Sequence, residues 1–167
     1  MIRNLLLSTA LCVSLAACGA SEQPKTDPKS KTAENQKAAA ETYFKVEDAI
    51  VLMPLIGSTQ TAAFMKITAL TDEPALLVSA SSPQAENVEL HTHSMAGGVM
   101  SMKRVDFIEI PPKGTASLQQ HGDHIMLFNL TDELKLGDTV VLELVILSDG
   151  NPKVVTVKAP VKSMIQG

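Results

Sequence analysis

The sequence predicts an all-β domain of the sandwich class, and three observations support this prediction. Short segments rich in Val, Ile, Leu and Thr recur from residue 43 to residue 161, as is typical of strands. Clusters of Pro, Gly, Asp and Asn separate these segments and indicate frequent turns. No long stretch shows the apolar period of an amphipathic helix. Short strands in this number, with frequent turns, fit a two-sheet sandwich. The segments expected to form strands are 43–52, 61–69, 75–81, 86–92, 98–103, 106–110, 115–119, 123–130, 139–147 and 153–161.

Residues 1–18 have the pattern of a bacterial lipoprotein signal peptide. Arg3 supplies positive charge, and residues 5–17 form an apolar run too short to span a bilayer as a helix. The run ends in the letters LAAC, which resemble a lipobox, so Cys18 is expected to become the lipidated mature N-terminus. The alternative is a plain secretory signal cut near Ala17 or Ala20. We expect an exported protein on the periplasmic side of a bacterial membrane, held at the inner or the outer membrane by lipid alone.

Residues 19–41 are rich in Lys, Glu, Ser, Pro and Ala and nearly lack large apolar side chains. Such a segment cannot bury enough surface to fold alone, so it is expected to be a flexible tether. As a random coil it would span roughly 25–30 Å. The folded domain is expected over residues 42–162, followed by a short tail at 163–167.

Cysteine content and charge exclude several classes of function. Cys12 leaves with the signal peptide and Cys18 carries lipid, so the mature domain has neither a free thiol nor a disulfide. Loss of Arg3 lowers the net charge of the whole chain, −4, by one. No basic stripe is present and Trp is absent, so the sequence gives no support for nucleic-acid binding.

Two histidines and two methionines form the most informative pattern of the chain. Ten residues separate His91 from Met102, twenty-one separate Met102 from His124, and one separates His124 from Met126. Thioether sulfur and imidazole nitrogen together favour Cu(I). The set contains no carboxylate, as Mg²⁺ or Ca²⁺ would require, and no thiolate, as structural zinc usually has. The sequence therefore predicts a site for one Cu(I) ion.

Strand alternation predicts that these four side chains lie close together. In the segment 86–92, His91 lies on the face opposite to Leu90, and His124 and Met126 share one face of the segment 123–130. Gly97 and Gly98 mark a turn that returns the strand of Met102 beside the strand of His91. We therefore expect the four donors in one small patch at an edge of the sandwich.

Other histidines and methionines lie near this pattern or far from it. His93 and His121 are outside the spacing and are expected as secondary donors, mainly for Cu(II), which prefers nitrogen. Met95 and Met100 form either an outer collar of the site or exposed loop methionines. The remaining candidates, Met53, Met65 and Met164, are expected to fill the core.

Catalytic chemistry finds no support in the sequence. Ser94 beside His93 has no acid partner and no glycine-framed nucleophile turn. No glycine-rich phosphate loop follows a strand. A blue-copper electron-transfer site needs a Cys thiolate, which this domain lacks. We expect neither an enzyme nor an electron carrier.

The spacing of the four donors resembles the signature of the periplasmic PCu(A)C copper chaperones, H(M)-x10-M-x21-H-x-M. The matching segments are ELHTHSMAGGVMSMKRV and QQHGDHIMLFNL, and the similarity extends from about residue 43 to residue 161 through SASSPQAENVELH, IEIPPKG and LKLGDTVVLELVI. There are departures: Lys103 and Arg104 stand where the family often has Arg-Pro, and Phe128 stands where another Met is common. None of these removes a ligand.

The resemblance implies a cupredoxin-like Greek-key sandwich that acts as a monomeric Cu(I) chaperone. The implied recipient is the dinuclear copper centre of cytochrome c oxidase subunit II, reached directly or through a thiol-bearing copper assembly factor. Two alternatives remain open. The same site could serve a copper buffer or tolerance protein without a dedicated client, or the chain could be a metal-free structural β-sandwich lipoprotein, in which the four donors need not converge.

Overall fold

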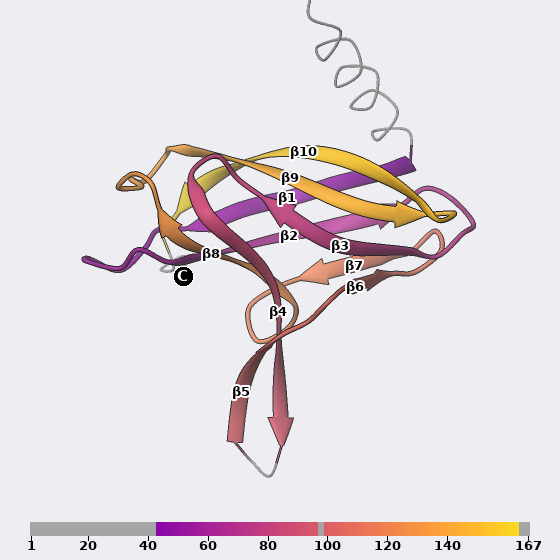
Figure 1. Ribbon diagram of the computed structural model, residues 1–167, viewed down its shortest axis with the longest axis horizontal. Helices are drawn as coiled ribbons and strands as arrows, with labels where there is room; N and C mark the ends of the chain where they lie inside the picture. The colour runs from indigo at the N-terminus through magenta and orange to yellow at the C-terminus, as the bar shows by residue number, and fades with distance from the viewer. Residues whose placement is uncertain (1–42, 97–98, 164–167) are drawn as a thin grey trace, which may run out of the picture.

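The structure is a computed structural model that describes residues 43–96 and 99–163, and these residues form ten strands (Figure 1). None of the described residues belongs to a helix that is long and apolar enough to cross a membrane. The expectations for the signal peptide, Cys18, the tether, the Gly97-Gly98 turn, Met164 and most of the tail lie outside the described residues. The strands are β1 (Phe44–Leu52), β2 (Thr61–Ala69), β3 (Ala75–Ser81), β4 (Ala85–Ala96), β5 (Val99–Arg104), β6 (Ile108–Ile110), β7 (Thr115–Leu118), β8 (His124–Leu130), β9 (Thr139–Ser148) and β10 (Asn151–Lys162).

Each expected strand is present, and most ends agree within two residues. The largest difference is β4, which continues to Ala96 instead of ending near residue 92. Residues 93–96 lack the β-branched side chains that indicate a strand. They are extended because they pair with β5, a tertiary contact that local sequence does not encode.

The strands are arranged in two sheets that pack face to face. The first sheet has the order β5-β4-β8-β2-β1, and the second has the order β10-β9-β3-β6. A short parallel contact between β1 and β10, at Val51 with Val161, joins them along one edge. Strand β2 pairs with β8 through its first residues and with β7 through its last, so both strands lie along the same side of β2.

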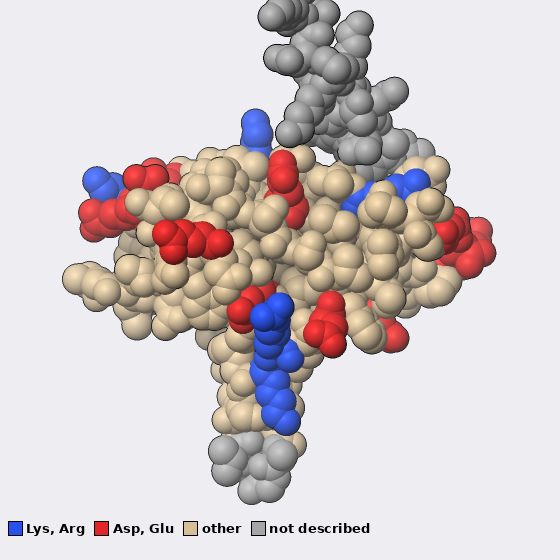
Figure 2. Space-filling model, in the orientation of Figure 1, with Lys and Arg blue, Asp and Glu red and all other residues tan. Residues whose placement is uncertain are grey.

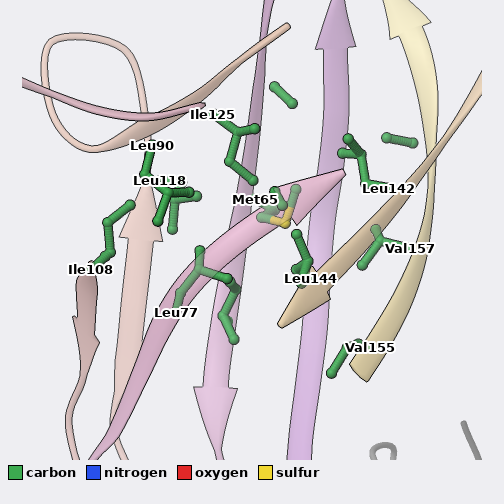
Figure 3. Close-up of a cluster of buried hydrophobic side chains, with 14 of the residues drawn as sticks. Met65, Leu77, Leu90, Ile108, Leu118, Ile125, Leu142, Leu144, Val155 and Val157 are labelled. Carbon is green, nitrogen blue, oxygen red and sulfur yellow. The ribbon is translucent and has the colours of Figure 1, made fainter. Parts of the chain in front are cut away.

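Alternating apolar side chains from both sheets fill the space between them. Strand β2 contributes Met65, and β9 contributes Leu142 and Leu144 (Figure 3). These three side chains and Ile67 of β2 are fully buried. The prediction that Met65 fills the core is thus confirmed. The same prediction for Met53 is wrong, because Met53 follows the end of β1 and is 37% exposed. Because β1 ends at Leu52, strand alternation does not determine the direction of the Met53 side chain.

The long strand β4 has two different neighbours along its length. Its first part pairs with β8 within the first sheet, and its last part pairs only with β5. Beyond His91 the β4–β5 hairpin leaves the sandwich and extends away from its body (Figure 1). Basic side chains, which β5 supplies through Lys103 and Arg104, lie along the hairpin in the space-filling view (Figure 2).

Candidate metal site

His91 and His124 face each other at the base of the β4–β5 hairpin. They are directly paired across β4 and β8, so both side chains lie on the same face of the first sheet. The ring centroids are 5.9 Å apart, and the ring planes are tilted by 53°. The neighbouring residues Leu90 and Ile125 point to the opposite face and are buried in the core. The sheet therefore presents two imidazoles side by side on its outer face.

A hydrogen bond to the residue two positions earlier orients each imidazole. His91 Nε2 lies 2.8 Å from a carboxylate oxygen of Glu89, and His124 Nδ1 lies 3.0 Å from the carbonyl oxygen of Gly122. An ionised carboxylate and a carbonyl can only accept, so the proton of each neutral ring must be on the nitrogen that makes this bond. The other nitrogen of each ring then carries a lone pair. This is the arrangement by which outer groups usually orient histidines that bind metals.

The two nitrogens with lone pairs are buried and make no hydrogen bond. They are Nδ1 of His91 and Nε2 of His124, and they are the buried side-chain polar atoms without a partner among the described residues. Burying a polar atom without a partner costs about 1–3 kcal/mol, so such atoms are rare in folded proteins. A metal ion bound to both nitrogens would remove this cost.

Met126 and Met102 lie on either side of the histidine pair. Met126 in β8 is opposite Glu89, and Met102 in β5 is opposite His93. Glu89, His91 and His93 share one face of β4 because side chains alternate along a strand. Directly paired residues share a face, so both methionine side chains lie on the face that carries His91 and His124. His91 is the central position, since His124 is directly opposite to it and each methionine occupies a diagonal position. Met102 is 46% exposed, so this side of the site is open to solvent.

Aromatic rings enclose His124. The ring of Phe64 is 6.2 Å away, and the ring of His93 stacks on it at 5.0 Å, which leaves the residue only 2% exposed. On the other side, Phe128 lies 5.9 Å from the ring of His91. Burial lowers the pKa of His124, although the hydrogen bond to Gly122 acts in the opposite direction. Burial thereby favours the neutral form of the ring, which is the form that can bind a metal.

Glu89 orients one of the candidate ligands, and the sequence pattern did not identify it. The hydrogen bond from His91 lowers the pKa of its carboxyl group most, followed by the bond from Asn87, and Arg104 adds a smaller effect. Asn87 Nδ2 donates to Glu89 at 2.9 Å, and Arg104 Nη1 approaches at 3.4 Å. The alternation Glu-x-His, which places Glu89 and His91 on one face, is the signal that could have revealed this role. Gly122 orients His124 in the same way, but through its backbone carbonyl, which cannot be recognised from residue types.

The secondary candidates also lie close to this patch. The rings of His93 and His121 are 5.9 Å apart, and His93 Nδ1 lies 3.4 Å from the Gly122 carbonyl oxygen. Even so, no group of three His, Cys, Asp or Glu side chains within residues 43–96 and 99–163 has a geometry suited to a metal. Two imidazoles need further donors to hold an ion, and the methionines are the donors that flank them. Such a set suits a soft cation.

Comparison with known proteins identifies a family for this domain. The family profile described as "Putative lipoprotein LpqE-like" matches residues 44–161. A protein named "Putative lipoprotein Lxx21020" from Leifsonia xyli subsp. xyli is 32% identical over 130 residues, which cover 75% of this chain and 76% of that protein.

Solved structures of copper proteins have the same fold. The Cu(I) form of DR1885 from Deinococcus radiodurans is 35% identical, with a TM-score of 0.60, covering 86% of this chain and 96% of that chain. The copper-bound PCuAC domain of PmoF2 is 23% identical, also with a TM-score of 0.60, covering 72% of this chain and 93% of that domain. The predicted cupredoxin-like β-sandwich is thereby confirmed.

Proposed function

The chain belongs to the LpqE-like lipoprotein family, and from this premise we propose that it is an extracytoplasmic copper chaperone. It binds one Cu(I) ion through His91 Nδ1, His124 Nε2 and the sulfur atoms of Met102 and Met126. Two structures similar to this chain, of DR1885 and the PmoF2 domain, contain copper, and one of them is a Cu(I) form. Copper is the cargo of such a protein, and the proposal assigns it no catalysis.

The observation that supports this proposal best is the pair of unpartnered buried nitrogens. Glu89 and Gly122 fix the protonated nitrogens of His91 and His124, so the two lone pairs are presented without any rearrangement of tautomers. Sites that exist before the ligand arrives bind with little loss of conformational entropy. A purely structural sandwich has no reason to bury unpaired nitrogens on two rings whose centroids are 5.9 Å apart.

The donor set and the position of the site suit transfer of copper. Thioethers are soft but uncharged donors for Cu(I). The site contains no negatively charged thiolate, which would hold the ion more strongly. Met102 lies on the exposed hairpin, whereas His124 is enclosed. A partner can therefore replace the outer thioether first, and each later ligand exchange needs only a small movement of the ion.

We also propose the location and the recipient of the copper. Lipid attached at Cys18 holds the protein on the periplasmic side of a bacterial membrane, consistent with the lipoprotein names of the family and of its relative. The recipient is the dinuclear copper centre of cytochrome c oxidase subunit II, or a thiol-bearing assembly factor that supplies this centre. A buffer protein with the same site would not restore oxidase activity, so oxidase assembly in a strain without this gene separates the two functions.

A competition titration tests the proposed binding. The mature chain is titrated anaerobically with Cu(I) in the presence of a chromophoric Cu(I) chelator. We expect one tightly bound equivalent, which His124→Gln weakens strongly and the matched exposed variant His121→Gln leaves unchanged. Repeating the pair with Cu(II) tests whether His93 and His121 act as secondary donors, in which case His121→Gln lowers Cu(II) affinity. Equal Cu(I) affinity of the two variants would contradict the proposal.

A further inference from the structure

The outer part of the β4–β5 hairpin carries two methionines that the copper site does not use. Met95 in β4 and Met100 in β5 are directly opposite each other. Such pairs have Cβ atoms roughly 4.5–5.5 Å apart, so two long thioether side chains can approach one ion. Both are exposed, at 72% and 51%. They therefore contribute little to the hydrophobic stability of the domain.

The two faces of the hairpin differ in their chemistry. Ser94 and Ser101 pair on one face, with their hydroxyl oxygens 3.4 Å apart. Met95 and Met100 alternate with these serines and lie on the other face, in line with the pair His93 and Met102. Soft donors thus gather on the face that leads to the copper site, whereas hydroxyl groups occupy the opposite face.

His93 connects the outer methionines to the site at the base. Its Nδ1 lies 3.4 Å from the Gly122 carbonyl oxygen, and its ring stacks on His124 at 5.0 Å. With the proton on Nδ1, Nε2 has no hydrogen bond to any residue in the described part of the chain. It is therefore free to bind a metal. His93 precedes Met95 by two residues and shares its face of the hairpin.

We propose that Met95, Met100 and His93 form a second site for a soft monovalent cation, Cu(I) or Ag(I), outside the four-donor site. The hairpin extends from the sandwich (Figure 1), so an ion can bind here without crossing the domain. From the outer site Cu(I) moves inward by ligand exchange. A bond to Met102 forms before a bond to Met95 or Met100 breaks, and the ion keeps its charge of +1 throughout. This inference goes beyond the proposed function, because its ligands are three residues outside the four-donor set.

Methionine methyl resonances provide a direct test. The full mature chain, with ¹³C-labelled methionine methyl groups and held in detergent, is titrated with Ag(I), a soft ion that does not change its oxidation state. The first equivalent should shift the methyl resonances of Met102 and Met126. The second should shift those of Met95 and Met100. A second equivalent that leaves Met95 and Met100 unshifted would overturn the proposal.

Paired substitutions separate the outer site from the four-donor site. The double variant Met95→Leu/Met100→Leu should lose the second equivalent and still bind the first, because it keeps all four donors of the inner site. Met53→Leu, at an exposed methionine away from the hairpin, is the control and should bind both equivalents. His124→Gln should keep the shifts of Met95 and Met100 while losing those of Met126. Binding of two equivalents by the double variant would refute the outer site. Failure of the proposed function would instead appear as Met102 and Met126 resonances that do not shift when Ag(I) is added.

Discussion

Removing the carboxylate of Glu89 should weaken copper binding although Glu89 is not itself a ligand. Glu89 accepts a hydrogen bond from His91 Nε2 at 2.8 Å, and this bond keeps the lone pair of the ring on Nδ1. In Glu89→Ala the ring can exchange its tautomer and rotate. The same change frees Arg104, which is opposite His91 and approaches Glu89 at 3.4 Å. Both effects disfavour a bound cation.

The expected magnitude follows from the kind of contact that is lost. Substitution of a group that orients a metal-binding histidine typically costs 10- to 100-fold in metal affinity, or about 1.4–2.7 kcal/mol. Glu89→Ala also lowers the stability of the fold, by about 1 kcal/mol for each hydrogen bond that is lost, because Glu89 accepts hydrogen bonds from His91, Asn87 and Arg104. Glu89→Gln keeps one oxygen that can accept the bond from His91 but removes the charge. We expect an intermediate loss of affinity for this variant.

Competition titrations with Cu(I) measure the effect, and denaturant unfolding of the metal-free protein measures stability. Glu109→Ala provides a matched control, since Glu109 is an exposed glutamate in β6. The control should match the wild type in both measurements. An affinity of Glu89→Ala within about twofold of the wild type, below the usual range for such groups, would refute the orienting role. So would an equal loss in the control.

Three further outcomes are expected. Met102→Leu or Met126→Leu should cause a strong loss of Cu(I) affinity and change the unfolding free energy by less than about 1.5 kcal/mol. The control Met65→Leu, in the core, should leave copper binding unchanged. A large loss of stability with intact copper binding would show that Met102 and Met126 are packing residues. Free Cu(I) buffered at about one hundred times its dissociation constant should raise the unfolding free energy by about 2.7 kcal/mol, and an unchanged melting temperature would contradict binding to the native state. Cys18→Ser should block lipid attachment and correct processing of the chain. A truncated chain that starts near Tyr43 should not sediment with membranes. Membrane association of this truncated chain would contradict an anchor made of lipid alone.

Much of the fold could be predicted because its strands are locally encoded. In β2, buried positions alternate from Thr61 to Ala69, and the sequence predicts both ends of this strand correctly. The extension of β4 to Ala96 could not be predicted, because it depends on pairing with β5 and not on the side chains of residues 93–96. The exposure of Met53 could not be predicted either, since it follows a strand end.

The placement of the four candidate donors on one face of the first sheet could be predicted from the sequence, but their surroundings could not. Alternation places His124 on the outer face, where a solvated side chain is the ordinary expectation. The structure instead shows a buried ring, because Phe64 and His93 come from other strands to cover it. The role of Gly122 depends on a backbone carbonyl, which every residue possesses. Tertiary pairing decides these features, and residue types alone do not encode it.

X-ray absorption spectroscopy of the Cu(I)-loaded mature chain tests the four-donor site most directly, at one equivalent of copper. We predict a first coordination shell with two nitrogen and two sulfur scatterers, and Met126→Leu should remove one of the two sulfurs. A shell without sulfur, or a shell that Met126→Leu leaves unchanged, would contradict the assignment of His91, Met102, His124 and Met126 as the ligands.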